Sequence, residues 1–260
     1  MKRRVAAFAC FAWLALSGCR TPPDAFSPAG WAALTAADPR PALRVAGLRE
    51  LAETRHALRA TARVGSEGPE GAVSTDQLLL VERPASLRVE VIGGVLQQRV
   101  LVLATDGASY ELYRAEGPVT EEGAVHAGVL EEVAGLPLTP EAAVRLLLAA
   151  PLAPDTPAES VQQDALGALR LRWPDQTLEF DGAGRLAALA FHPGERGERG
   201  ERAVLYARWS DWRALDTGAF PHRLELELPE AKTRWQLEYR QVELDPELDP
   251  ALFRLGLGTR

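Results

Sequence analysis

The feature that most restricts the fold of this chain is a succession of short segments in which apolar and charged residues alternate. In residues 87–92 (LRVEVI), leucine and the valines fall on one side of an extended strand, and arginine and glutamate fall on the other. The dipeptide Asp106-Gly107 is a strong hairpin signal between two such segments. Comparable segments recur along most of the chain with short spacings, which favours a curved antiparallel sheet with one apolar face.

We expect a mainly β fold: a single antiparallel half-barrel of about ten or eleven strands, covered by helices. The glycine-rich and polar segments Gly65–Gly71 and Gly117–Gly123 are expected to be loops. The expected strands span residues 58–64, 77–82, 87–92, 99–104, 109–114, 168–173, 176–180, 186–192, 203–209, 220–228 and 234–242.

Helical periodicity appears in two places. From Ala42 onward, Leu43, Leu51 and Thr54 recur near the helical period, which predicts a helix before the first strand. Residues 127–150 predict a short helix and then a longer one, in which Thr139 is the N-cap residue and Pro140 occupies the first turn. The second helix is apolar on most of its surface. We therefore expect the 127–150 block to cover the apolar face of the sheet.

The N-terminus has the layout of a secretory signal. Three basic residues precede an uncharged run of 12 residues, Val5–Leu16, which is shorter than the ~20 residues that span a bilayer. The following Leu16-Ser17-Gly18-Cys19 resembles the lipobox of bacterial lipoproteins. The alternative is an ordinary signal peptide in which Cys19 occurs by chance.

The lipobox resemblance implies cleavage after Gly18 and acylation of Cys19. Residues 1–18 would then be a signal peptide, 19–40 a lipid anchor and tether, and 41–260 the folded domain, attached to the membrane through Cys19. Position 20 is Arg, whereas lipoproteins retained in the inner membrane carry Asp there. We therefore expect an outer-membrane lipoprotein whose domain faces the periplasm.

Charge and motif content exclude several functions. The formal net charge is −7, with 29 basic and 36 acidic residues, so nucleic acid is not an expected partner. Two cysteines cannot form a disulfide framework, and the four histidines lack metal-site spacing. No nucleophile elbow, phosphate loop or dinucleotide fingerprint is present. We expect no metal, no cofactor and no catalytic residues. A hydrolase with an unrecognised site is the alternative.

The apolar faces of the strands and of the second helix supply the candidate site. They either fill a packed core or line a cavity for acyl chains. The candidate lining residues are Leu87, Val89, Val91, Leu101, Leu103, Leu146, Leu147, Trp173, Phe180, Tyr206, Leu226 and Trp235.

Residues 86–150 resemble the LolB family of outer-membrane lipoproteins, which belongs to the LolA/LolB lipoprotein-localisation superfamily. The resemblance is carried by the alternating strand 87–91, the strand 99–103, Asp106-Gly107, the segment Tyr110–Tyr113 and the run from Leu130 to the helix ending before Pro151. The residues 248–253 (LDPALF) resemble the closing segment of the superfamily. The resemblance implies a half-open sheet with a helical lid over an apolar cavity.

The resemblance also implies a function. The protein would receive acyl chains of lipoproteins or lipids from a LolA-like periplasmic donor and insert them into the membrane. Val95 and Leu96 match the apolar membrane-insertion loop of the family, although a Gly-Gly-Val-Leu turn replaces the family's turn sequence. In the alternative interpretation, these two side chains fold back onto the core. The alternative function is a structural or interaction lipoprotein with a filled core.

Overall fold

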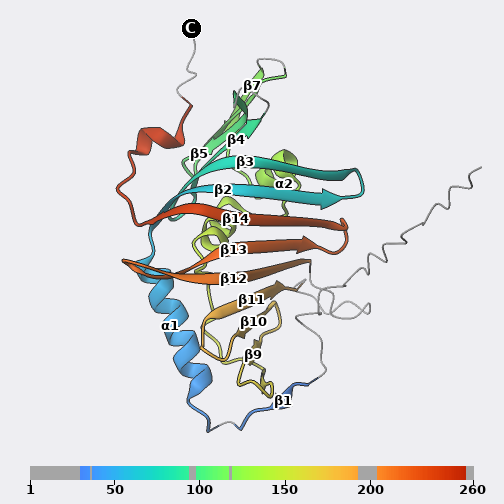
Figure 1. Ribbon diagram of the computed structural model, residues 1–260, viewed down its shortest axis with the longest axis vertical. Helices are drawn as coiled ribbons and strands as arrows, with labels where there is room; N and C mark the ends of the chain where they lie inside the picture. Colours follow the sequence, from blue (N-terminus) through green and yellow to red (C-terminus); the bar gives the residue numbers. More distant parts are fainter. Residues whose placement is uncertain (1–29, 36, 94–97, 117–118, 193–203, 256–260) are drawn as a thin grey trace, which may run out of the picture.

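The structure is a computed structural model that describes residues 30–35, 37–93, 98–116, 119–192 and 204–255. Its strands form one curved antiparallel sheet of 14 strands, in the order β1-β8-β9-β10-β11-β12-β13-β14-β2-β3-β4-β5-β6-β7 (Figure 1). The edge strands β1 and β7 do not pair with each other, so the sheet is open. The mainly β architecture expected from the sequence is therefore confirmed.

The strands of the first half are Ala57–Gly68 (β2), Gly71–Glu82 (β3), Ser86–Gly93 (β4), Gln98–Thr105 (β5), Ser109–Arg114 (β6) and Val119–Ala124 (β7). Those of the second half are Ser160–Gln163 (β8), Leu169–Arg172 (β9), Gln176–Phe180 (β10), Leu186–Phe191 (β11), Leu205–Leu215 (β12), Gly218–Leu228 (β13) and Thr233–Leu244 (β14). The two-residue strand β1 is Ala32–Ala33.

The strand count is higher than expected because three strands lack an apolar pattern. β1, β7 and β8 lie at or next to the edges of the sheet, where backbone hydrogen bonds hold them without a buried face. β7 has the sequence VTEEGA and was expected to be part of a loop. The expected loop Gly65–Gly71 is also mostly strand, because β2 and β3 pair as far as Gly68 and Gly71.

The strand order explains where the helices lie. β2–β7 and β8–β14 are two meanders, and β14 pairs with β2 where they meet. β7 is one edge of the sheet and β8 lies beside the other, so the chain between them must cross the sheet. This connection contains α2 (Val129–Ala134) and α3 (Pro140–Leu147), and α3 contacts β3 and β4. α2 lies behind β2 and β3 in Figure 1.

The first helix, α1 (Arg40–Thr54), packs beside the second half of the sheet (Figure 1). Its buried residues are Leu48 and Ala52, whereas Leu43 is 64% exposed. The apolar stripe expected through Leu43 was therefore wrong in register, because alanine and leucine occur on several sides of this helix.

The expected tether at 19–40 reaches the sheet before α1 begins. Ala32–Ala33 pairs with Gln162–Gln163 of β8, and the backbone N of Leu34 donates to the Val161 carbonyl at 3.0 Å. The residues from 32 onward are thus attached to the edge of the domain. Cys19 and the signal peptide lie outside the described residues.

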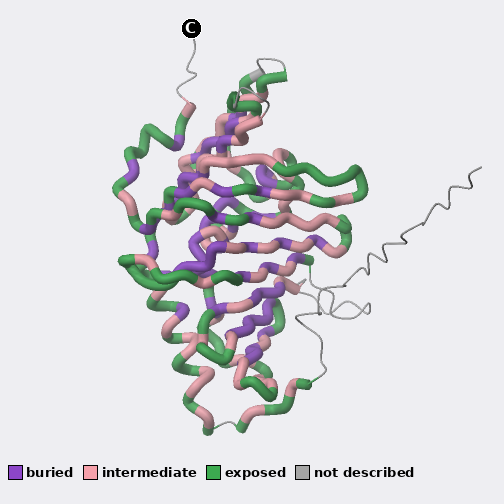
Figure 2. The backbone as a smooth tube through the Cα atoms, in the orientation of Figure 1, coloured by how far each residue is buried: buried purple, intermediate pink, exposed green. Residues whose placement is uncertain are grey.

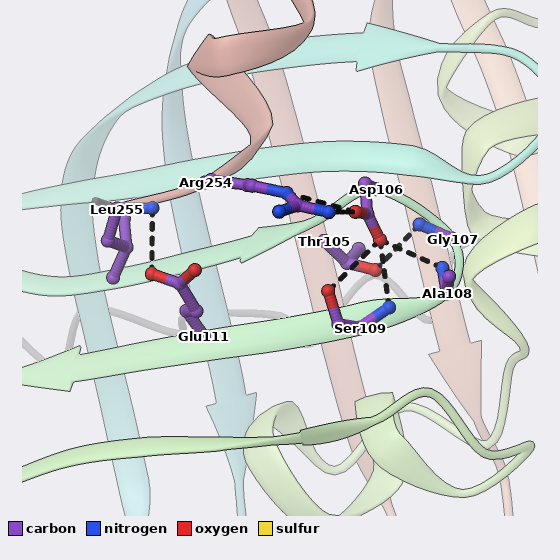
Figure 3. A network of polar contacts seen from close by, with 8 residues as sticks. All are labelled: Thr105, Asp106, Gly107, Ala108, Ser109, Glu111, Arg254 and Leu255. Atoms are coloured by element: carbon purple, nitrogen blue, oxygen red, sulfur yellow. Dashed lines mark hydrogen bonds and ion pairs between the residues drawn. The ribbon is translucent and has the colours of Figure 1, made fainter. Parts of the chain in front are cut away.

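The C-terminal segment lies across the outer face of the sheet and ends in the 3₁₀ helix η1 (Pro250–Phe253). Leu248 and Phe253 form a small apolar cluster with Ala57 and Leu80. Arg254 and Leu255 then bond to the β5–β6 hairpin, as Figure 3 shows. Arg254 Nη2 lies 2.7 Å from Asp106 Oδ2, and the Leu255 backbone N donates to Glu111 Oε2 at 2.9 Å.

Candidate functional site

An apolar cavity with a volume of about 220 Å³ lies between the sheet and the α2–α3 segment. Strands β13, β14, β2, β3, β4 and β5 form its floor, and residues 130–147 form its roof. All of its described lining residues are apolar except Gln77. They are Val64, Gln77, Leu79, Leu87, Val89, Val91, Leu101, Leu103, Leu130, Val133, Ala134, Leu136, Leu138, Ala143, Leu146, Leu147, Leu224, Leu226, Trp235 and Leu237.

The strand register gathers the floor residues on one face. Side chains that are directly opposite one another in adjacent strands point to the same side of the sheet. The relevant pairs are Leu226 with Trp235, Leu224 with Leu237, Leu237 with Val64, Leu79 with Val89, Val89 with Leu103 and Val91 with Leu101. Alternation within each strand therefore produces a continuous apolar floor across six strands.

Nine of the twelve candidate lining residues lie on this cavity. They are Leu87, Val89, Val91, Leu101, Leu103, Leu146, Leu147, Leu226 and Trp235. Trp173, Phe180 and Tyr206 do not line it. Trp173 and Phe180 are buried in the core beside β9 and β10, and Tyr206 lies with Arg208 on the outer face. Apolar character alone could not distinguish these positions, because both halves of the sheet have a buried face.

The residues missed by the sequence interpretation belong to the same faces. Val64, Leu79, Leu224 and Leu237 alternate in step with predicted neighbours, so their periodicity could have identified them. The connection between α2 and α3 contributes Leu136 and Leu138, which carry no periodic signal. Only the crossing path of the chain places them over the sheet.

The exposure of the lining residues locates the mouth of the cavity. Leu79, Leu103 and Leu146 are buried. The lining residues that are only half-buried include Gln77, Val91, Leu101, Trp235 and the roof residues Val133, Ala134 and Leu136. The mouth therefore lies between α2 and the ends of β3, β4 and β5.

The predicted insertion loop at Val95 and Leu96 comes next in the sequence after the end of β4 that lies near the mouth. Gly93 of β4 pairs with Gln98 of β5, two residues beyond the pairing of Val91 with Leu101. Val95 and Leu96 themselves lie outside the described residues.

The roof is attached to the sheet at the C-terminal end of α3. The last carbonyls of a helix have no partner within the helix. Here, side chains from β12, β14 and the end of α1 supply the donors: Trp209 Nε1 to Leu146 O at 3.2 Å, Tyr239 Oη to Leu147 O at 3.5 Å, and Arg55 Nη1 to Leu148 O at 3.0 Å. Burial raises the pKa of the Tyr239 hydroxyl, which therefore remains a donor at neutral pH.

At α2 and the start of α3, the hydrogen bonds that the structure describes and that cap the helices join residues within the roof itself. Thr139 Oγ1 accepts the Ala142 backbone N–H at 3.2 Å at the start of α3. Gly135 ends α2 with φ of 67°, a left-handed conformation that favours glycine. The Leu136 N–H then bonds to the Leu130 carbonyl at 3.2 Å and directs the Leu136 side chain toward the cavity.

Charged groups are partnered outside this cavity. Glu90 is buried on the outer face of β4 between Arg88 and Arg99, with Glu90 oxygens 2.6 Å and 2.7 Å from their guanidinium nitrogens. Asp106 accepts backbone N–H bonds from Ser109 and Ala108 and a side-chain bond from Arg254 (Figure 3). These bonds, that of Ser109 foremost, hold the pKa of Asp106 well below its usual range.

The described residues contain no group of three or more His, Cys, Asp or Glu arranged to hold a metal ion. None of the helices in the described ranges combines the length and the apolarity needed to cross a membrane. The apolar side chains that line the cavity suit binding through apolar contact.

An open antiparallel sheet with a helical roof over an apolar cavity is the LolA-like fold, and solved structures of that class superpose on this chain. A LolA-superfamily protein from Nitrosomonas europaea aligns with a TM-score of 0.51 and 11% identity, over 81% of this chain and 97% of that chain. A candidate outer-membrane lipoprotein-sorting protein domain from Vibrio parahaemolyticus aligns with a TM-score of 0.52 and 9% identity, over 81% and 94%.

A DUF1329 family protein from Desulfovibrio piger gives a TM-score of 0.52 and 9% identity, over 84% of this chain and 98% of that chain. No family model and no curated protein sequence matches the chain. At the level of the fold, these superpositions confirm the LolA/LolB resemblance expected from residues 86–150.

Proposed function

We propose that this chain is a non-enzymatic envelope lipoprotein that binds acyl chains of lipoproteins or lipids in the cavity beneath α2 and α3 and passes them to a membrane. The observation that carries the proposal is the composition of the cavity wall. Nineteen of its twenty described lining residues are apolar, and they come from both the sheet and the roof. An apolar wall without paired charges gives water no favourable contacts and gives a hydrocarbon chain many.

The volume of the cavity suggests that an acyl chain enters in two stages, first with the roof in place and then with α2 displaced. The volume of about 220 Å³ is below the ~300–1,000 Å³ of pockets that enclose drug-sized ligands. It accommodates part of a chain with the roof in place. Each additional buried CH₂ contributes ~0.8 kcal/mol, so a longer chain gains free energy that favours displacement of α2 from the mouth.

The remaining parts of the proposal rest on the sequence. Acylated Cys19 would anchor the domain in the outer membrane, with the domain in the periplasm. Val95 and Leu96, which follow β4 in the sequence and lie outside the described residues, would enter the membrane during release. A LolA-like periplasmic protein is the expected donor. The competing function, a scaffold with a filled core, is disfavoured by the cavity, and we propose no enzymatic activity.

The direct test is binding of a fluorescent fatty-acyl probe to the full chain carrying Cys19→Ser, which has no acyl chain of its own to occupy the cavity. Leu147→Arg places a cation at a half-buried lining residue of the cavity roof. We expect it to weaken probe binding by at least roughly tenfold, because the guanidinium must be desolvated beside the chain.

Leu166→Arg is the matched control. Leu166 is 86% exposed and does not line the cavity, so this variant adds the same charge without affecting the probe. Equal probe affinity of the Leu147→Arg and Leu166→Arg variants, both folded by circular dichroism, would contradict the proposal. Mass spectrometry of organic extracts gives a second measurement: acyl lipids should copurify with the control and be depleted from Leu147→Arg.

A further inference from the structure

The mouth of the cavity has an uncharged polar side. Gln77 is the one polar side chain among the described lining residues. Its Nε2 donates to Thr75 Oγ1 at 3.2 Å, and both residues are half-buried. Thr75 and Gln77 are two positions apart on β3, so they share the face of the sheet that forms the cavity floor.

β3 changes from exposed at the turn with β2 to buried farther along the strand (Figure 2). Val73 is 64% exposed, Thr75 and Gln77 are half-buried, and Leu79 and Val81 are buried. A chain that enters along β3 thus passes two hydrogen-bonding side chains before it meets only hydrocarbon. This order matches an amphiphile whose polar linkage stays at Thr75 and Gln77 while its tail lies over Leu79.

The charged side chains near Thr75 and Gln77 either lie on the outer face of the sheet or form ion pairs. Asp76 lies between Thr75 and Gln77 in sequence and hence on the outer face, where Arg240 Nη1 is 3.2 Å from its Oδ1. On the cavity face, Arg114 is opposite Leu101 in the next strand, and it forms an ion pair with Glu121. No charged residue is among the described residues of the cavity wall.

Trp235 provides an additional donor at the mouth. It lines the cavity and is half-buried, and its Nε1 is buried without a hydrogen-bond partner in the described part of the chain. A buried donor without an acceptor costs free energy that an incoming oxygen atom can recover. The Gln77 amide has a second N–H beyond the one that bonds to Thr75, and this N–H is a further donor.

We infer that the cavity selects acyl lipids whose chain is joined to the headgroup through a neutral ester or amide, and that Gln77 is the specificity-determining residue. Ester and amide oxygens need only hydrogen-bond donors, which Gln77 offers. The ionised carboxylate of a free fatty acid would lose water at the mouth without gaining a cation. This inference rests on the proposed acyl-binding function and adds the class of ligand.

The test is competition for the fluorescent acyl probe on the full chain carrying Cys19→Ser. Monolauroylglycerol and laurate have the same chain and differ in their polar end, and at pH 8 laurate is ionised. We expect monolauroylglycerol to compete at least roughly tenfold better. Gln77→Leu should weaken monolauroylglycerol roughly three- to tenfold, as the loss of one hydrogen bond predicts, and should leave laurate unchanged.

Gln77→Arg makes the test a gain of function. A guanidinium at this position supplies the cation that laurate lacks, so laurate should compete roughly tenfold better than on the unmodified cavity. Gln236→Arg is the matched control: Gln236 is on the outer face of β14, where its Nε2 donates to Glu238 Oε1 at 2.6 Å. It introduces the same charge and should leave the preference unchanged.

The possible outcomes distinguish acyl binding itself from selection of a neutral ester or amide linkage. If the probe binds but laurate competes as well as monolauroylglycerol, or if Gln77→Arg and Gln236→Arg behave alike, the inference about the linkage is wrong while acyl binding stands. Failure of the probe to bind at all would overturn the proposed function and the inference together.

Discussion

Glu179 on β10 is a buried carboxylate whose surroundings shift its pKa strongly from the ordinary value. Its Oε1 lies 2.6 Å from Arg170 Nη2, and the Arg170 guanidinium lies over the Trp31 ring at 4.2 Å. Burial raises the pKa of Glu179 to about 7 despite the attraction of Arg170. A segment near the N-terminus thus helps to keep water from an ion pair on the outer face.

The raised pKa predicts a pH-dependent stability. Between pH 4.5 and about 7, the folded state retains a proton on Glu179 that the unfolded state releases. The contribution of this residue to the free energy of unfolding is therefore complete below pH 4.5 and declines as pH rises toward 7. Relative to Glu179→Gln, which does not titrate, the wild type should lose roughly 1–3 kcal/mol between pH 5 and pH 8.

Urea unfolding of both proteins at the two pH values measures this difference, and all other titrating groups cancel in the comparison. A constant difference between wild type and Glu179→Gln would show that Arg170 keeps the carboxylate ionised across the range.

At the scale of the element, α3 is held at one end more strongly than at the other. Three side-chain donors, two from the sheet and one from the end of α1, bond to its last carbonyls. The Arg55 guanidinium also interacts favourably with the negative end of the helix dipole. Arg55 Nη2 donates in addition to the Ala219 carbonyl at 2.6 Å, so it joins the roof to β13. The caps at Thr139 and Gly135 are local to the roof. From this asymmetry we expect that any opening of the roof begins at α2 and pivots near Leu148.

Two substitutions separate the roles of these two ends. Thr139→Ala removes the cap of α3 and should destabilise the roof locally by about 1 kcal/mol. We expect faster amide hydrogen exchange in 129–144, little change in the global free energy of unfolding, and faster association of the acyl probe.

Arg55→Leu leaves the buried Leu148 carbonyl without its side-chain donor and removes the bond to the carbonyl of Ala219, an exposed residue. It should lower the global free energy of unfolding by about 1–3 kcal/mol. Hydrogen exchange with mass-spectrometric readout resolves the two patterns. Uniform acceleration across 140–148 in Thr139→Ala, with no difference between the ends of α3, would argue against a pivot near Leu148.

At the scale of the whole molecule, the sheet could be predicted from the sequence to the extent that its strands alternate. All eleven expected strands are present, and the cavity floor on β4 and β5 follows from the spacing of Leu87, Val89 and Val91. The strong N-cap pattern at Thr139-Pro140 likewise identified the start of α3. Strand alternation and helix capping depend on residues that are close in the sequence, so both can be recognised without knowledge of the tertiary structure.

The features that sequence reasoning missed depend on distant contacts. The polar strand β7 exists because β6 offers it a ladder of hydrogen bonds, and the burial of Trp173 outside the cavity depends on how β9 and the 154–157 segment fold together. The position of Gln77 at the mouth could not be predicted from the sequence either, because a polar residue on a predicted strand is normally assigned to the solvent-exposed face. The register with Val91 places it on the cavity side.

The most direct test of the acyl cavity is photo-crosslinking of the full chain carrying Cys19→Ser with a lipid that has a diazirine in its acyl chain, with adducts located residue by residue by mass spectrometry. We expect adducts on Leu79, Val89, Leu103 and the roof residues 130–147. We expect none on Leu78 or Arg88, their neighbours on the opposite face. Adducts on both faces of β3 and β4 alike, or a pattern that Leu147→Arg does not diminish, would contradict a lipid-binding cavity beneath α2 and α3.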